Sequence, residues 1–342
     1  MKLKQANSEE IEIPTKLPLL ESLCWNINNP YRLNHEQMLA LYEERWRFKG
    51  VLGNLEPEES FFIKKLIARY KGLPLIDMNN KNKEAVFKAG KTILARLDNN
   101  LLHQHRVVLG GGALIGMLHG QLRYSRDLDF LIAPQDYNKL AYRLRSGESV
   151  FAFQDNLEVS EPRIDRYGIR YPVRVKEGGE KFTFKVEIIS EWNMQIDTPE
   201  SIYNIACLNE CDRISAKLLA NVDRGYDSSK FSRDLIDLAI IASQSKIPSA
   251  AIDKATGIYP DALSALIKSI QRFQDYPNYR DKCYENLQIN RPEVIIDGID
   301  YLAKKCSLKP TQRTFKETDF SYLDPEPKTD NSTIVRSDES ER

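Results

Sequence analysis

The spacing of apolar side chains predicts helices near the start of the chain. Apolar positions recur at helical intervals in residues 35–48 and 58–70, so we expect one helix in each stretch. Residues 1–34 contain three prolines and show no regular period, which predicts irregular structure. Together these stretches indicate a small helical N-terminal unit over residues 1–82.

The pattern changes from helical to extended in the middle of the chain. A helix is expected over residues 83–105 and a short strand over 106–109, followed directly by glycines. A second helix is predicted at 113–120, a buried strand at 128–132 and a third helix at 134–144, which opens with proline. The order strand, glycine turn, helix, strand, helix is typical of an α/β core.

Two longer stretches of alternating character follow this core. Residues 167–176 and 181–190 alternate apolar and polar side chains, and Gly178-Gly179 between them is a hairpin signal. We expect both strands to extend the same sheet. The fold class predicted for residues 83–197 is therefore α/β (α+β), with a mixed sheet.

The remainder of the chain is predicted to be helical and then disordered. Helical periodicity dominates residues 198–306, which we interpret as a helical domain. Residues 307–342 are rich in Lys, Asp, Glu, Ser, Thr and Pro, which is typical of disorder. No stretch approaches the ~20 apolar residues that span a bilayer, and the N-terminus lacks a signal-peptide pattern. A soluble, cytoplasmic protein without a membrane partner is expected.

Composition narrows the function only slightly. The 49 basic and 49 acidic residues cancel, so any affinity for nucleic acid must come from a local patch. The five cysteines are odd in number and scattered, which argues against a disulfide framework and for a reducing compartment. Cys207 and Cys211 lack a second pair at zinc-site spacing, so we interpret them as buried thiols on a helix.

Paired carboxylates are the clearest chemical feature. Asp127 and Asp129 are two apart at the start of the apolar strand, so both project from one face. Oxygen ligands of this kind suit Mg²⁺ or Mn²⁺ beside a nucleotide phosphate. Glu187, an acid inside a later strand, is the candidate third ligand. A solvated strand end is the ordinary alternative for the Asp pair taken alone.

The segment before the Asp pair offers groups that bind phosphate. Gly110, Gly111 and Gly112 lie between a strand and a helix, where free N–H groups can cradle a triphosphate. Arg123 and Ser125 add a cation and a hydroxyl next to the carboxylates. The glycines could also form only a tight turn, and Arg123 only a surface ion pair.

The order and spacing of these residues resemble a known family. Residues 109–114 and 123–130 resemble the opening motif of the AbiEii/AbiGii toxin family of nucleotidyltransferases, which belongs to the polymerase-β-like superfamily. Residues 214–224 and 232–238 resemble its later Lys-Leu-Leu and Arg-Asp-Leu-x-Asp-Leu motifs. The resemblance covers roughly residues 85–245, and the MenT toxins are among the relatives.

The resemblance implies a polymerase-β-like nucleotidyltransferase palm over residues 83–197, followed by a helical domain. It also implies an enzyme that transfers a nucleotide from an NTP with the help of Mg²⁺. Asp127 and Asp129 would be the metal ligands and Lys217 a phosphate-contacting lysine, with Asp234 or Asp237 supporting the site. A tRNA end is the expected acceptor, and a cognate antitoxin the expected protein partner. One departure is Gly112, where the family usually has Ser or Thr.

Two other readings of the sequence stay open. One is transfer of a nucleotide to a protein or a small molecule. The other is a nucleotide-binding module without catalysis, which Gly112 and the isolated position of Glu187 would suggest. An ordinary surface lysine is the alternative for Lys217, and Asp237 could simply pair with Arg233 four residues earlier.

Overall fold

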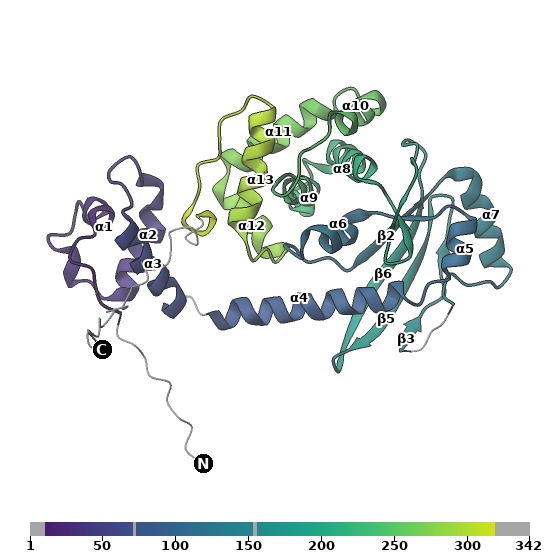
Figure 1. Cartoon of the computed structure of the whole chain (residues 1–342), viewed down its shortest axis with the longest axis horizontal. Coiled ribbons are helices and arrows are strands. Elements are labelled where there is room, and N and C mark those ends of the chain that lie inside the picture. Colours follow the sequence, from purple (N-terminus) through teal and green to yellow (C-terminus); the bar gives the residue numbers. More distant parts are fainter. Residues whose placement is uncertain (1–10, 71–72, 153–155, 319–342) are drawn as a thin grey trace, which may run out of the picture. The chain divides into compact units, whose positions relative to one another are not determined.

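The computed structural model describes residues 11–70, 73–152 and 156–318, which fall into two compact units (Figure 1). The boundary between the units lies at residues 71 and 72. The helix α4 (Leu73–Leu94) therefore belongs with the sheet that follows it, whereas the sequence pattern placed the boundary after residue 82.

The first unit is helical. Its elements are α1 (Pro18–Leu23), η1 (Pro30–Arg32), α2 (His35–Arg45), η2 (Trp46–Phe48) and α3 (Pro57–Tyr70). The buried Glu59 carboxylate accepts hydrogen bonds from the backbone N–H groups of Leu19 and Leu20, at 2.8 and 2.7 Å. These bonds satisfy the free N-terminal donors of α1, which begins at Pro18. A helix therefore forms inside the stretch that was expected to be irregular.

The second unit is built on a mixed sheet, which confirms the predicted fold class. Among the described residues it has eight strands in the order β3-β5-β6-β2-β1-β8-β7, with β4 paired to β5. The strands β2 and β6 run parallel, and β5 and β6 form the long antiparallel hairpin. The strands are β1 (Val108–Leu109), β2 (Asp127–Ile132), β3 (Leu157–Val159), β4 (Arg163–Ile164), β5 (Gly168–Glu177), β6 (Glu180–Ser190), β7 (Glu200–Ile202) and β8 (Ile205–Cys207).

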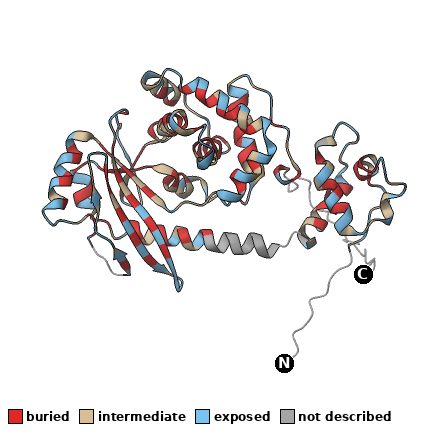
Figure 2. Cartoon of the chain, turned by 180° about the vertical axis from the view of Figure 1, so that it is seen from behind, coloured by how far each residue is buried: buried red, intermediate tan, exposed pale blue. Residues whose placement is uncertain are grey.

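One face of the sheet packs against helices from the N-terminal side of the unit. The helices α4, α5 (Asn99–Gln104) and α7 (Pro134–Arg145) share a core with the inward residues of β2, β5 and β6. Burial alternates along these strands, as Figure 2 shows. The single helix expected over 83–105 is divided, because Asp98 caps a new helix by accepting from the N–H of Leu101 at 3.0 Å.

The helical region from α8 onward forms a second core. It contains α8 (Glu210–Arg224), η3 (Ser228–Lys230), α9 (Arg233–Ala242), α10 (Ser249–Ile258), α11 (Ala262–Asp275), α12 (Pro277–Asn286) and α13 (Pro292–Lys305). The helix α6 (Gly111–His119) contributes to both cores, with Leu114 in the first and Ile115 in the second. Figure 1 shows α6, α8 and α9 near one another beside β2.

Three sequence expectations need correction in this part of the chain. The strands β7 and β8 occupy the start of the region expected to be helical, so Cys207 lies on a strand rather than a helix. The expected disordered tail is packed up to Thr318, since η4 (Phe315–Glu317) brings Glu317 to Arg280, with Nε–Oε1 at 2.6 Å and both side chains fully buried. Residues 319–342 lie outside the described part of the chain.

Within the described ranges, none of the helices has both the length and the apolar character needed to cross a membrane.

Candidate active site

The alternation of β2 places the paired carboxylates on the face of the sheet opposite the first core. Leu128 and Phe130 are buried in that core, so Asp127 and Asp129 between and before them project from the other face. The parallel register with β6 pairs Asp129 with Glu187. The third carboxylate predicted from sequence is therefore the direct cross-strand neighbour of Asp129.

A cavity of about 470 Å³ opens over this face of the sheet. Its floor comes from β2 and β6, and its wall comes from α8 and the start of α9. Five of the predicted site residues line it, namely Gly111, Asp127, Asp129, Glu187 and Lys217. Lys185 lines it from β6, and the wall contributes Arg213, Arg224, Lys230 and Arg233, so acids on the sheet face a largely basic wall.

Asp129 is held in an electrostatically unfavourable state. Burial and the neighbouring charge of Asp127 raise the pKa of Asp129 above its usual range, and Glu187 adds to the repulsion. Its carboxylate makes no hydrogen bond to any residue in the described ranges. A cation, or a hydrogen-bond donor from a ligand, would offset the repulsion between the carboxylates and would satisfy the unbonded oxygens of Asp129. The Asp pair therefore fits a metal ion.

The glycine turn is shaped around Asp129. Gly111 has a φ of +70°, and a Cβ there would collide with Asp129, lying 2.8 Å from its Cβ atom. A side chain at this position would therefore be strained and would also push the carboxylate aside. Gly110 lies outside the cavity lining, and its N–H donates to the carbonyl of Asp129 at 2.7 Å. Gly110 thus anchors the turn to β2.

Glu187 is already engaged by two cations. Its Oε1 accepts from Arg170 Nε at 2.9 Å, and its Oε2 pairs with Lys185 Nζ at 2.5 Å. Across the part of the chain that the structure describes, no three His, Cys, Asp or Glu side chains are grouped closely enough to hold a metal ion. The predicted trio is therefore not preassembled. Asp129 forms no ion pair within the described ranges, and Asp127 has only a long one, with its Oδ1 4.0 Å from Lys185 Nζ.

Lys217 is a buried member of an ionic network rather than a surface lysine. Its Nζ lies 3.1 Å from Asp234 Oδ1 and 2.7 Å from Asp237 Oδ2. Arg224 also binds Asp234, at 2.6 Å from Nε to Oδ2. Burial alone would raise the pKa of Asp234, but Lys217 and Arg224 outweigh it and hold that pKa well below its usual range. The later sequence motifs thus meet at the wall of the cavity.

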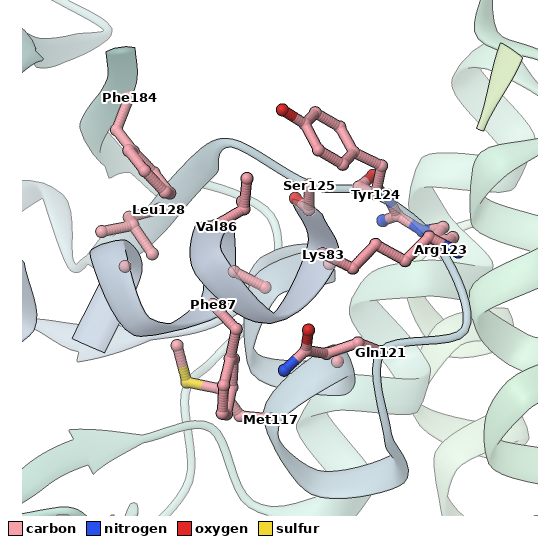
Figure 3. Close-up of a pocket in the computed structure, with 14 residues that line it drawn as sticks. Lys83, Val86, Phe87, Met117, Gln121, Arg123, Tyr124, Ser125, Leu128 and Phe184 are labelled. Carbon is pink, nitrogen blue, oxygen red and sulfur yellow. Dashed lines mark hydrogen bonds between the residues drawn. The ribbon is translucent and has the colours of Figure 1, made fainter. Parts of the chain in front are cut away.

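Gly112, Arg123 and Ser125 line a different, smaller cavity, drawn in Figure 3. The Arg123 guanidinium pairs with Asp237, so the pairing of Asp237 with Arg233 suggested by sequence does not occur. A Cβ at Gly112 would collide with this guanidinium and lie 2.8 Å from Arg123 Cζ. The glycine thus makes room for the arginine. In this structure Arg123 and Ser125 do not reach the cavity that Asp129 lines.

The comparison with protein families decides the assignment. The family described as "Nucleotidyl transferase AbiEii toxin, Type IV TA system" matches residues 92–318. The chain belongs to the AbiEii nucleotidyltransferase toxin family. The match extends well past the motifs recognised in the sequence and includes the whole helical region after α8.

The similarity of this AbiEii-family chain to solved structures is low. JHP933 from Helicobacter pylori is 21% identical, with a TM-score of 0.42 over 65% of this chain and 93% of the other. MenT4, a nucleotidyltransferase toxin from Mycobacterium tuberculosis, is 19% identical, with a TM-score of 0.36 over 58% of this chain and 71% of the other. No curated protein matches the chain. The assignment rests on the family match alone.

Two residues of this AbiEii-family site escaped the sequence analysis although signals for them exist. Lys185 lies two residues before Glu187 on β6 and so shares its face. Arg170 lies opposite Glu187 because the Gly178-Gly179 turn pairs Glu177 with Glu180 and fixes the hairpin register. Counting residues in both directions from that turn would have placed Arg170 opposite Glu187 on the basis of the sequence alone.

Proposed function

We propose that this AbiEii-family protein transfers a nucleoside monophosphate from an NTP to a hydroxyl group at the end of an RNA, with tRNA as the acceptor class, and releases pyrophosphate. The observation that supports this most is the cavity itself. Asp127 and Asp129 project from its floor, and Lys217, Arg224 and Lys230 line its wall. Carboxylates for a metal and cations for a triphosphate therefore face one space.

The residues on the floor fit a divalent cation, Mg²⁺ or Mn²⁺. Asp127 and Asp129 would hold it, since neither carboxylate forms a hydrogen bond within the described ranges. Glu187 would join them only by releasing Arg170 or Lys185. The chemistry that such an ion supplies when bound is neutralisation of phosphate charge and activation of the attacking hydroxyl.

The wall supplies the groups for the triphosphate. Lys230 and Arg233 line the cavity and form no ion pair with another described residue. Gly111 places the N-terminus of α6 beside Asp129, where backbone N–H groups favour an anion. In the proposed reaction the acceptor oxygen forms a bond to the α-phosphorus, and the bond from the α-phosphorus to the oxygen that bridges to the β-phosphate breaks. Pyrophosphate leaves with that oxygen, and the hydroxyl proton passes to solvent.

A groove next to the cavity supports RNA as the acceptor. It has a volume of about 960 Å³ and is lined by Lys268, Arg272 and Lys282 together with aromatic rings. Tyr226 and Tyr276 are 55% and 61% exposed. Cations combined with exposed rings suit the phosphates and bases of single-stranded RNA.

The groove and the cavity share one loop. Arg272 donates to the backbone carbonyl of Tyr226 at 3.0 Å, which fixes the segment directly after α8. Arg224, at the end of α8, lines the cavity, and Tyr226 lines the groove. An RNA strand lying in the groove would therefore end close to the wall that faces Asp127. We include a cognate antitoxin in the proposal because the family is described as a type IV toxin–antitoxin toxin.

The test is a labelling experiment with the purified protein. Total tRNA, Mg²⁺ and each NTP labelled at the α-phosphate are incubated with wild type, Asp129→Asn and Asp223→Asn. Asp223 lines the same cavity from α8 but is outside the proposed metal pair, so its variant is the matched control. We expect label on RNA with wild type and Asp223→Asn, and none with Asp129→Asn.

Other outcomes would redirect or refute the proposal. Label on protein or on a small molecule in place of RNA would refute the acceptor and retain the transfer reaction. Equal labelling by wild type and Asp129→Asn would refute the site. Absence of transfer by any protein, with NTP binding intact, would favour a binding module. The melting temperature of each variant shows whether it is folded.

A further inference from the structure

The small cavity of Figure 3 is separate from the catalytic cavity. It lies between α4 and α6 and has a volume of about 40 Å³. Leu128 and Phe184 line it, and both belong to the core face of the sheet. Asp127 and Asp129 project from the opposite face. The two cavities therefore lie on opposite sides of β2, and Arg123 lines only the smaller one.

Lys83 is the unusual residue of this cavity. It is 4% exposed, and its Nζ has no hydrogen-bond partner among the described residues. Burial lowers the pKa of Lys83 to about 8. An ammonium group that is buried without a partner is costly, and such groups normally bind a counter-charge or hydrogen-bond acceptors. The nucleotidyl transfer proposed above does not use Lys83.

The described lining around Lys83 carries no negative charge. None of the described residues that line the cavity is acidic. Lys83 extends toward Arg123 in Figure 3, and the guanidinium of Arg123 is already neutralised by Asp237. The cavity therefore carries an uncompensated positive charge at Lys83. The nearby polar side chains Gln121 and Ser125 also line it and form no hydrogen bond to another described residue.

We propose that this cavity binds a small tetrahedral oxyanion of the size of inorganic phosphate, held by the ammonium group of Lys83 with Gln121 and Ser125 as further hydrogen-bond donors. The size follows from the volume, because about 10–15 Å³ is needed for each water, so the space holds roughly three water molecules. A nucleotide is too large for it. The site is therefore an addition to the NTP site and does not depend on the proposed reaction.

The experiment measures the effect of inorganic phosphate on the melting temperature at constant ionic strength, with chloride as the balancing anion. Wild type should show a saturable rise. Lys83→Met should melt higher than wild type without phosphate, because an unpaired buried charge is removed, and should lose the phosphate response. The apparent phosphate affinity should fall by at least about tenfold, the factor expected for one charge-assisted hydrogen bond.

Three further variants separate this site from the alternatives. Lys88→Met changes an exposed lysine on the same helix and should retain the response. Asp129→Asn alters the catalytic cavity and should also retain it. Gly116→Leu fills the small cavity, where a Cβ meets no atom within 4 Å, and should lose the response while keeping Lys83. This variant tests the site even if Lys83→Met does not fold.

Two results would overturn the proposal. One is a phosphate response of the same size in wild type, Lys83→Met and Gly116→Leu. The other is a wild-type protein whose melting temperature does not respond to phosphate beyond the effect of chloride. Loss of the response in Asp129→Asn alone would place the anion in the catalytic cavity and refute the second site.

Discussion

Arg123 and Asp237 are 114 positions apart in sequence and form a two-pronged ion pair, with Nε–Oδ1 at 2.5 Å and Nη2–Oδ2 at 2.8 Å. Asp237 also contacts Lys217 at 2.7 Å. The pair joins the segment before β2 to α9. Its geometry is specific to arginine, because only a planar guanidinium places two donors on one carboxylate.

Arg123→Ala should therefore lower the free energy of unfolding by about 3–5 kcal/mol, because it leaves the buried Asp237 with one cation fewer. Arg123→Lys should recover only part of this loss. The measurement is chemical denaturation of wild type, Arg123→Ala, Arg123→Lys, Asp237→Ala and the double variant Arg123→Ala/Asp237→Ala. A double variant that loses the sum of the two single losses would show that the pair is not coupled.

Gly112 offers a second test of the same packing. Gly112→Ser restores the residue type usual in the family and places a side chain where the Arg123 guanidinium lies, so we expect a loss of about 1–3 kcal/mol. In the Arg123→Ala background the same substitution should cost much less. Denaturation of the four proteins gives the coupling, and an equal cost in both backgrounds would contradict the clash.

The network around Asp234 predicts a dependence of stability on pH. Its pKa is lowered in the folded state, so Asp234 stabilises the fold above its unfolded pKa of about 3.9 and loses this contribution as the pH falls. Asp234→Asn should therefore destabilise the protein most near neutral pH and progressively less below about pH 4. Parallel denaturation curves across pH measure the difference. A penalty that grows on acidification would show that the sign is wrong.

The basic and aromatic groove predicts how RNA affinity responds to charge. Lys268→Glu and Lys282→Glu should each weaken tRNA binding, since each removes one phosphate contact. Each should also reduce the slope of log affinity against log salt concentration by about one. Tyr276→Ala should weaken binding with little change in the salt slope. Lys176→Glu on β5, far from the groove in sequence, is the matched charge control. Fluorescence anisotropy without NTP measures binding independently of catalysis.

Much of the sheet could be predicted because its long strands alternate clearly. The strand at 128–132 and the hairpin around Gly178-Gly179 were expected from sequence, and β2, β5 and β6 confirm them. The strands β7 and β8 are only three residues long, which is too short for alternation to be distinguished from a helix start.

The candidate site was predictable where its parts are local in sequence. Asp127, Asp129 and Gly111 line one cavity as their spacing suggested, and register added Glu187. The ionic partners of Lys217 were not predicted, because pairing between distant elements leaves no periodic pattern. Those of Glu187 follow from the strand period and the hairpin register. Arg123 shows the limit most clearly: its position near the Asp pair suggested phosphate binding, but its partner is on α9.

The alternation of β2 also determines which mutations this protein can tolerate. Successive residues of this strand alternately line the cavity and the hydrophobic core. A single substitution on β2 affects only the face of the sheet on which its side chain lies. Insertion or deletion of a single residue before Asp127 would exchange the two faces of the strand. The carboxylates would then point into the hydrophobic core, and Leu128 would point into the cavity. For this segment, natural and laboratory variation should therefore consist of replacements, while changes of length accumulate in the loops beyond its ends.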